Sequence, residues 1–287
     1  MPFSKFETRN GMSIRITIDV ENLSGSTSDS SFINPLEPLL RLLEKHDAKA
    51  TFFVVGSLAP VWKESLVRLS RDGHEIGLHG HTHEHLANLG RDKFRNGITE
   101  GKQILEDVLG REIGGFRAPY FSLTDKSEWA HQILFDAGFK FSSSVLPVWN
   151  PQACFSKAPK LPFSWNSGLI EFPVPTFGIG KFGVPLLGGA YLRLAPQPLF
   201  DIARRIGSNR TGEWSYCHPY DFDVNAEFER VRHSSWIFSK LLFMRRGLML
   251  ERIEKLLKYG YSKSFEEQMN DARFIESLPL FRQRSRK

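Results

Sequence analysis

Four histidines fall within seven residues of this sequence: His79, His81, His83 and His85. Histidines four positions apart can bind one metal ion if the segment turns helically, and alternate histidines can converge if the segment is extended. A partly exposed histidine cluster with no ligand role is the plain alternative. Because so dense a run rarely fills a protein core, the segment predicts a metal site.

Two carboxylates, Asp19 and Glu21, lie two residues apart at the end of a β-branched run. Side chains two positions apart share one face while a strand continues. One carboxylate could then bind a metal ion while the other acts as a general base. Solvated turn acids, or a helix cap, are the alternative interpretation.

Two further motifs, RAPY at residues 117–120 and CHPY at residues 217–220, carry an arginine and a histidine. Arg117 could keep a carboxylate ionised, and the proline after it would fix the backbone N–H of Tyr120 as an oxyanion donor. His218 could be a general acid, because its unperturbed pKa lies near neutrality, or a structural hydrogen-bonding group. Together with the metal site and the carboxylates, these motifs make up the inventory of a hydrolase.

Strand and helix patterns alternate through the first half of the chain. Apolar or β-branched runs predict strands at 13–19, 50–55, 75–78, 115–117 and 139–142, with helices between them at 34–43, 60–71, 92–109 and 126–137. This alternation predicts an α/β fold with a parallel sheet or barrel and helices outside. Asp19, His79 and Arg117 each close an expected strand, where active sites of such folds gather.

The second half is less regular. Residues 149–189 are rich in Pro, Gly and Phe and predict a loop-rich insertion, and 213–217 predicts a strand that ends at His218. Residues 228–259 predict a basic helix in which Lys240 and Arg245 interleave with apolar side chains. Such a helix could lie on an anionic membrane. Packing on the barrel with a solvated basic face is the favoured interpretation.

Composition narrows the class of protein and its partners. The chain has 287 residues, of which 41% are hydrophobic and 24% charged, as in a globular protein with a large core. Its formal net charge of +6 favours anionic partners such as a phosphate-bearing lipid, a membrane surface or an acidic polymer. No dense basic run interleaved with aromatics indicates nucleic acid, so we expect no nucleic-acid partner.

The expected location is the cytoplasm, with the inner face of the membrane as a candidate position within it. The two cysteines form no CxxC pair, which favours a reducing compartment. Residues 1–15 lack the apolar core of an export signal, and no run approaches the roughly 18 to 20 apolar residues that span a bilayer.

In this order, the motifs resemble those of the polysaccharide deacetylase family, also called the NodB-homology or carbohydrate esterase 4 group, over residues 14–218. The most similar branch is that of the exopolysaccharide-locus deacetylases with a C-terminal extension. The segments that carry this resemblance are GFRAPYFSLTDKSEWA, EFPV, GGAYLRL and HPYDFD. The resemblance implies a distorted (β/α) barrel of about seven strands. It also implies one domain, with a catalytic core at about 12–225 and a C-terminal helical extension at about 226–287.

The resemblance further implies a single divalent metal ion, usually zinc. Its HxxxH ligands fall on His79 and His83, which leaves His81 and His85 as neighbours. Family members carry adjacent aspartates or Asp-x-Asp after the first strand, and here the metal ligand of that pair is Glu21. The glutamate departs from the family pattern.

By the same resemblance, Asp19 is the base and Arg117 positions it. Tyr120 provides the backbone N–H that helps to hold the oxyanion, and His218 is the general acid. Ser142 departs from the family, because relatives usually have an aspartate there that helps to tune the arginine or the acid histidine. Asp221 or Asp223 would have to compensate, or activity would be reduced.

These residues predict metal-dependent hydrolysis of the N-acetyl group of an amino sugar, in a polysaccharide or its lipid-linked precursor, with release of acetate. A deformylase or amidase acting on another N-acyl sugar is one alternative, because pocket shape alone sets the acyl group. A catalytically inactive carbohydrate-binding relative is the other, and Ser142 is its best support. The location and the positive charge favour a lipid-linked or nucleotide-linked substrate.

Overall fold

The computed structural model describes residues 14–21, 28–150, 153–179, 182–207, 214–231, 235–258 and 264–282. The N-terminal residues used in predicting the location, and Glu213 of the last expected strand, lie outside this part of the chain. Eleven strands are described: β1 Arg15–Val20, β2 Ala50–Val54, β3 Glu75–Leu78, β4 Gly115–Phe116, β5 Phe141–Ser142, β6 Phe163–Trp165, β7 Ile170–Glu171, β8 Phe177–Ile179, β9 Phe182–Val184, β10 Trp214–Cys217 and β11 Leu280–Phe281.

Nine of these strands form one sheet in the order β10-β1-β2-β3-β4-β5-β7-β6-β11. Every pairing from β10 to β7 is parallel, which makes seven parallel strands, whereas β6 runs antiparallel to β7. The expected α/β fold with a mostly parallel sheet is therefore confirmed. Within the described residues no pairing joins β10 to β11, so closure into a barrel is not observed there.

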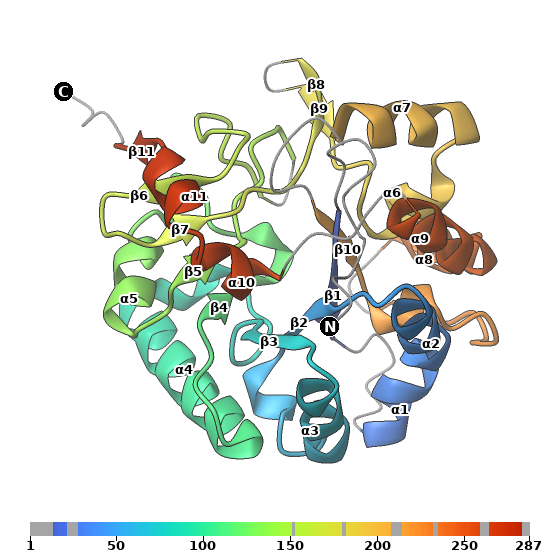
Figure 1. The fold of residues 1–287 in the computed structure, drawn as a ribbon, viewed down its shortest axis with the longest axis horizontal. Coiled ribbons are helices and arrows are strands. Elements are labelled where there is room, and N and C mark those ends of the chain that lie inside the picture. The colour runs from blue at the N-terminus through green and yellow to red at the C-terminus, as the bar shows by residue number, and fades with distance from the viewer. Residues whose placement is uncertain are drawn as a thin grey trace, which may run out of the picture.

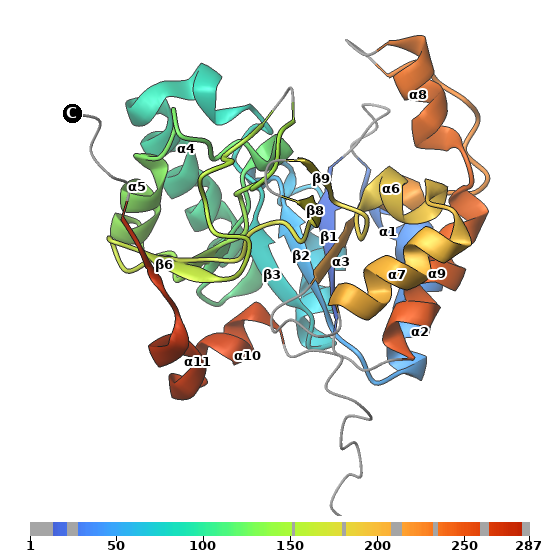
Figure 2. The same ribbon diagram turned by 90° about the horizontal axis from the view of Figure 1, so that it is seen from above.

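Helices surround this sheet (Figure 1). In both views α4 and α5 lie to one side, while α1, α2, α6, α7 and α9 gather on the other (Figure 2). The described α-helices are α1 Asp29–Ile33, α2 Glu37–Lys45, α3 Lys63–Arg71, α4 Leu86–Leu109, α5 Ala130–Asp136, α6 Gly189–Leu194, α7 Gln197–Gly207, α8 Trp236–Phe243, α9 Met249–Leu257, α10 Phe265–Met269 and α11 Ala272–Ser277. Short 3₁₀ turns are η1 Asn34–Leu36, η2 Gly56–Leu58, η3 Pro119–Phe121, η4 Pro219–Asp221 and η5 Arg246–Leu248.

The central strands are buried on both faces, and in β1 one of these faces carries the polar residues Arg15, Thr17 and Asp19. All six residues of β1 and all five of β2 are buried, as expected of parallel strands covered on both sides. Helix α4 begins six residues earlier than expected, because a kink at Gly90, with φ of 69°, joins a first turn to the main helix. The first helical segment likewise begins before Asn34, at α1, where the Ser28 side chain caps the N-terminus.

The second half differs from expectation in two places. The expected loop-rich insertion contributes β6 and β7 to the main sheet and forms the β8–β9 hairpin. The expected helix over 228–259 is divided into α8, η5 and α9, because Met244 is extended, with ψ of 139°, and Arg245 is left-handed, with φ of 55°. None of the described helices is long and apolar enough to cross a membrane.

The C-terminal extension is built into the body of the protein. Helix α9 packs on α2 and α6 through buried Ile253 and Leu256. The ring of Phe265 in α10 lies against Phe53, Phe141 and Phe172 of the sheet region. The extension also ends in a strand, β11, which pairs with β6. It is therefore not purely helical, and its contacts help to hold the sheet that carries the candidate site.

Candidate active site

The candidate metal ligands meet at the carboxyl ends of β1 and β3. Glu21, His79 and His83 each offer a ligand atom, and these atoms lie within 4.8 Å of one another. Strand β1 ends at Val20, so Glu21 reaches the cluster from the first residue after the strand. His83 follows in the loop after β3, in a left-handed conformation with φ of 57°. The structure thus brings together the three residues expected to hold a metal ion.

His79 has the environment of a neutral metal-binding imidazole. Its side chain is buried, and its Nδ1 lies 3.1 Å from the backbone oxygen of Arg117. A proton on Nδ1 donates to that oxygen and leaves Nε2 as the ligand atom, an arrangement typical of metal-binding histidines. Burial lowers the pKa of His79 to about 4, so the ring is neutral at neutral pH.

Glu21 provides the anionic member of the cluster. Its carboxylate contacts the His83 ring at Nε2 and accepts a hydrogen bond of 3.3 Å from the Tyr220 hydroxyl. Burial raises the pKa of Glu21, but His83, His218 and His79 outweigh it and hold this pKa well below its usual range. One ionised carboxylate and two imidazoles are a donor set that fits zinc or a similar divalent metal ion.

The other two histidines of the run serve elsewhere. The His85 side chain caps α4 by accepting a hydrogen bond of 3.1 Å from the backbone N–H of Ala87. His81 Nε2 lies 3.6 Å from a carboxylate oxygen of Glu100, on the outer side of α4. The HxxxH spacing, and not the density of histidines, therefore marks the residues that converge.

The candidate base Asp19 is held by a buried arginine. Arg117 Nη1 donates to Asp19 Oδ1 at 2.5 Å and to Thr17 Oγ1 at 2.8 Å, while Nη2 donates to Ser143 Oγ at 3.0 Å. Both charged side chains are almost completely buried. The guanidinium of Arg117 also lies 4.0 Å from the ring centroid of Phe53. These contacts fix the carboxylate in one orientation beside a permanent cation.

Tyr120 lies in an unusual turn directly after Pro119. Tyr120 and Phe121 both have left-handed backbone conformations, with φ of 59° and 52°, which are uncommon for residues other than glycine. The Tyr120 ring lies 4.9 Å from the His83 ring, centroid to centroid. The strained turn thus places the side chain of the expected oxyanion residue beside the metal cluster.

The candidate acid His218 lies near the other carboxylate oxygen of Glu21, the one that His83 does not contact. Its Nε2 is 3.5 Å from Glu21 Oε1, and its Nδ1 is 3.0 Å from Asp221 Oδ2. Burial lowers the pKa of His218, but the hydrogen bond to Asp221 and the nearby charges of Glu21 and Asp19 outweigh burial and raise it to about 9. The ring is therefore protonated at neutral pH and can give up a proton.

A second buried arginine supports this acid. Arg193 Nε donates to Asp221 Oδ1 at 3.1 Å, and both side chains are almost fully buried. The same guanidinium donates to the backbone oxygens of Leu241 and Leu242, at 3.1 and 2.8 Å, and also to that of Met244. Arg193 has no local sequence signal, because all of its partners lie far along the chain.

Ser142 takes no part in this acid pair. It donates to Ser144 Oγ at 2.8 Å, and Ser144 Oγ in turn accepts from the backbone N–H of Ala118 at 2.8 Å. The buried carboxylate opposite Ser142 in the sheet register is Glu171, which accepts from the backbone N–H of Ser144 at 2.6 Å. Of the two acids named as possible substitutes for the missing aspartate, Asp221 is the one that contacts His218.

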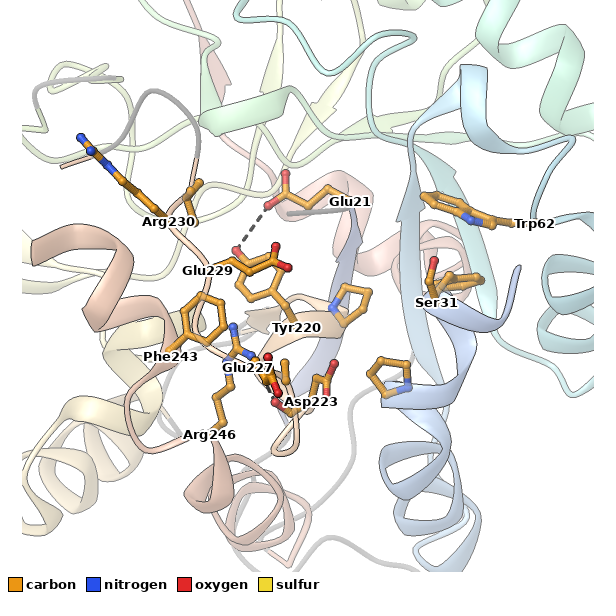
Figure 3. Close-up of a pocket in the computed structure, with 15 residues that line it drawn as sticks. Glu21, Ser31, Trp62, Tyr220, Asp223, Glu227, Glu229, Arg230, Phe243 and Arg246 are labelled. Carbon is orange, nitrogen blue, oxygen red and sulfur yellow. Dashed lines mark hydrogen bonds between the residues drawn. The ribbon is translucent and has the colours of Figure 1, made fainter. Parts of the chain in front are cut away.

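A pocket of about 280 Å³ adjoins the cluster and has Glu21 in its wall (Figure 3). One side is formed by Trp62 and Ser31, and the opposite side by Tyr220, Phe243 and other residues of 219–246. Aromatic faces, carboxylates and arginines all line it. Such a mixed lining offers flat apolar surfaces together with hydrogen-bonding groups.

Comparisons with known proteins divide the chain into two matched segments. A family model described as polysaccharide deacetylase matches residues 24–141, and a model described as a domain of unknown function, DUF3473, matches residues 143–270. The carboxylates Asp19 and Glu21 precede the first segment, and His218 lies in the second. The candidate site therefore draws residues from both segments and from the strand before them.

Curated relatives resemble a part of the chain. A peptidoglycan-N-acetylglucosamine deacetylase of Bacillus cereus is 33% identical over 93 residues, covering 32% of this chain and 34% of that protein. A chitooligosaccharide deacetylase of Azorhizobium caulinodans is 29% identical over 125 residues, covering 43% of this chain and 57% of that protein. The chain thus spans about a third of the length of the first relatives it matches.

Solved structures resemble the fold over almost the whole chain. A structure assigned as a polysaccharide deacetylase from Mycobacterium smegmatis has a TM-score of 0.61 at 19% identity, covering 100% of this chain and 99% of that one. A carbohydrate esterase 4 pseudoenzyme from Bacillus anthracis has a TM-score of 0.50 at 17% identity, covering 91% and 66% of the two chains. Residues 24–141 thus form a polysaccharide deacetylase domain of the NodB-homology or carbohydrate esterase 4 type.

Proposed function

We propose that this protein is a metal-dependent hydrolase that removes the N-acetyl group from an amino sugar in a polysaccharide or its lipid-linked precursor. The observation that carries the proposal is the convergence of Glu21, His79 and His83 between two supported side chains, Asp19 and His218. Each reacting group that N-deacetylation needs has a candidate in this arrangement. Relatives named as peptidoglycan and chitooligosaccharide deacetylases support the substrate class.

Asp19 would begin the reaction as general base. A divalent metal ion held by Glu21, His79 and His83 would supply an acidified water and a polarised acyl carbonyl. Asp19 would accept the proton of the water while the oxygen of the water attacks the acyl carbon. Arg117 would keep the Asp19 carboxylate oriented. The backbone N–H of Tyr120 would donate to the developing oxyanion.

His218 would complete the reaction as general acid. The bond between the acyl carbon and nitrogen breaks, and the protonated ring gives its Nε2 proton to the departing amine. Asp221 at Nδ1 stabilises the charged ring before the transfer and fixes its orientation. Acetate and a free amino sugar are the products.

We propose zinc as the metal ion. Imidazole and carboxylate ligands suit zinc, and three protein ligands are typical of catalytic zinc sites that keep a position open. Metal analysis of the purified protein tests this directly. We expect the wild-type protein to contain one equivalent of zinc and the Glu21→Gln variant to lose both zinc and activity. Full activity in the presence of a strong chelator would exclude the scheme.

The neighbouring pocket is the proposed place for the rest of the saccharide. Sugar rings stack on aromatic faces such as Tyr220 and Phe243, and carboxylates such as Glu229 accept hydrogen bonds from sugar hydroxyls. We propose the exopolysaccharide or cell-surface polysaccharide pathway as the setting, on the similarity of the segments named above. Acetate release from N-acetylated oligosaccharides of increasing length tests the proposal.

An inactive carbohydrate-binding relative is the second candidate, favoured by Ser142 and by the pseudoenzyme among the structural neighbours. The Asp221 contact with His218 argues against it, because the acid has a carboxylate partner without an aspartate at Ser142. A panel of N-acetyl and N-formyl sugars, with release of both acids measured, separates the candidates. Acetate release supports the deacetylase, formate release alone supports a deformylase, and saccharide binding without either supports an inactive relative.

A further inference from the structure

Helix α8 presents an apolar surface to solvent. The α8 surface consists of Trp236, Ile237, Phe238, Leu241 and Met244, whose exposed fractions are 53%, 68%, 50%, 37% and 47%. The buried positions of the helix are occupied by Ser239 and Leu242. Figure 2 shows α8 standing away from the sheet and its surrounding helices. The favoured expectation that this segment packs its apolar side on the barrel is therefore wrong for α8, although α9 does so.

The α8 surface is a formed structure and not a frayed end. The Ser235 hydroxyl caps the helix by accepting from the backbone N–H of Phe238. At the other end, Arg193 donates to the backbone oxygens of Leu241 and Leu242, and Arg246 Nε also donates to that of Leu242 at 3.0 Å. Because both ends are held, the apolar side chains are exposed in the folded protein.

Two exposed cations, Lys240 and Arg245, lie beside the α8 surface. Residues 231–250 contain no aspartate or glutamate; of their two other cations, Arg246 is buried and Arg232 lies outside the described residues. Lys240 Nζ lies 3.8 Å from the ring centroid of Trp236, and Arg245 directly follows the exposed Met244. Apolar side chains flanked by cations fit a surface whose hydrocarbon lies behind anionic headgroups. A second protein surface would need an acidic rim to match the same charges.

We propose that the α8 surface docks on an anionic lipid bilayer. Trp236, Ile237 and Leu241 would enter the interface between headgroups and hydrocarbon, while Lys240 and Arg245 contact lipid phosphates. Phe243 and Arg246, at the end of α8, line the pocket that contains Glu21, so docking would bring this pocket close to the lipid surface. The use of this placement for a lipid-linked substrate rests on the proposed function. Docking itself does not, because it needs no catalysis.

Vesicle sedimentation of the purified full chain tests the proposal. We expect the protein to sediment with vesicles of phosphatidylcholine mixed with phosphatidylglycerol, and to bind about tenfold more weakly to phosphatidylcholine alone or at high salt. The double variant Ile237→Glu with Leu241→Glu should bind the anionic vesicles at least about tenfold more weakly, because two carboxylates enter the contact surface.

A matched control uses another exposed apolar pair, Ile179 and Phe182 of the β8–β9 hairpin, which are 90% and 76% exposed. The variant Ile179→Glu with Phe182→Glu should keep wild-type vesicle binding. Absence of binding to anionic vesicles, or equal loss in both double variants, would overturn the proposal. A dimer seen by light scattering and abolished by the α8 variant would assign the surface to a second copy of the chain.

Two further measurements separate docking from folding and from catalysis. The α8 variant should keep the wild-type melting temperature, because the substituted side chains are exposed. It should also keep acetate release from a water-soluble oligosaccharide. Vesicle binding by a wild-type protein that releases no acetate would contradict the proposed function and leave the docking proposal standing.

Discussion

Two buried arginine–aspartate pairs flank the metal cluster, and they do different work. On the base side, Arg117 of the β4 end holds Asp19 of β1 directly. On the acid side, Arg193 of α6 holds Asp221, which in turn holds His218. The same pair of charges therefore supports the proposed proton acceptor on one side and the proposed proton donor on the other. The two sides differ because the aspartate of the acid side, Asp221, contacts a further side chain, His218.

The two arginines also differ in what satisfies their remaining N–H groups. Arg117 uses side-chain oxygens of Thr17 and Ser143 and one backbone oxygen, that of Ser143, all in the central sheet region. Arg193 uses backbone oxygens at the end of α8, including that of Leu242. The base side is thus self-contained in the core of the fold, whereas the acid side depends on the position of the C-terminal segment.

The largest effect should come from removing the base itself. We expect Asp19→Asn to lower kcat by about 10²- to 10⁴-fold, because the amide cannot accept the proton of the water. Acetate release measures the loss, and metal analysis should show unchanged metal content. Asp92→Asn on the exposed surface of α4 is the matched control and should keep full activity. An Asp19→Asn variant with full activity would remove Asp19 from the base role.

Breaking either arginine pair should cost comparable stability. Replacing Arg117 or Arg193 by Met leaves a buried aspartate without its cation, which destabilises a protein by about 3 to 5 kcal/mol. Urea unfolding measures both variants. The variant at Arg193 should also loosen α8, which proteolysis of residues 235–244 would detect. If only one variant is destabilised, the two pairs do not contribute comparably to the free energy of unfolding.

The acid side can be tested through its pH dependence. His218 has a pKa of about 9, above the usual value near 6.5, and Asp221→Asn removes the largest stabilising partner of the charged ring. In the metal-free variant, NMR titration should show the pKa of His218 moving down toward 6.5. The alkaline fall in kcat/KM should move to lower pH in the same direction, since the reaction needs the protonated ring.

The raised pKa of His218 also has a consequence for stability. A group protonated more readily in the folded state adds stability that is fully present below its unfolded pKa, near 6.5. This contribution is lost as the pH rises from there through about 9. The wild-type protein should therefore lose stability over this interval relative to Asp221→Asn. Parallel pH profiles of the two melting temperatures would contradict the assignment.

The smallest effect is expected at Ser143 on the base side. Ser143→Ala removes the acceptor of Arg117 Nη2 and should cost about 1 to 3 kcal/mol, because a buried N–H group is left without this partner. Urea unfolding measures the cost, and Ser30→Ala at the exposed start of α1 is a control. Arg193 offers no equivalent substitution, because backbone oxygens stay in place in every variant.

Sequence patterns identified the regular part of the fold well. Strands β1, β2 and β3 are buried on both faces and long enough to be recognised, and the bounds of β3 are those expected. Strands β6 and β7 were missed because they have only three and two residues in a segment rich in Pro and Gly. Short strands like these are specified by the neighbours they pair with, which a local pattern does not reveal.

The candidate site was predictable where its residues close strands. Glu21, His79 and His83 converge as expected, whereas density alone would have included His81 and His85. The support around these residues was less accessible. Asp221 could be found from its position three residues after His218, but Arg193 could not, because its contacts span 28 to 51 positions along the chain. Long-range electrostatic partners of this kind leave no local signal.

The pairing of β1 with β10 has a consequence for how the protein is made. Ile18 of β1 faces Cys217 of β10, so the two strands are separated by about 200 positions in the chain. At a synthesis rate of about 5 to 20 residues per second, β1 waits for roughly 10 to 40 seconds before this neighbour is made. During that interval one edge of the strand that carries Asp19 lacks its final partner on the ribosome. The proposed base is thus synthesised about 200 residues before the neighbouring strand that completes its surroundings.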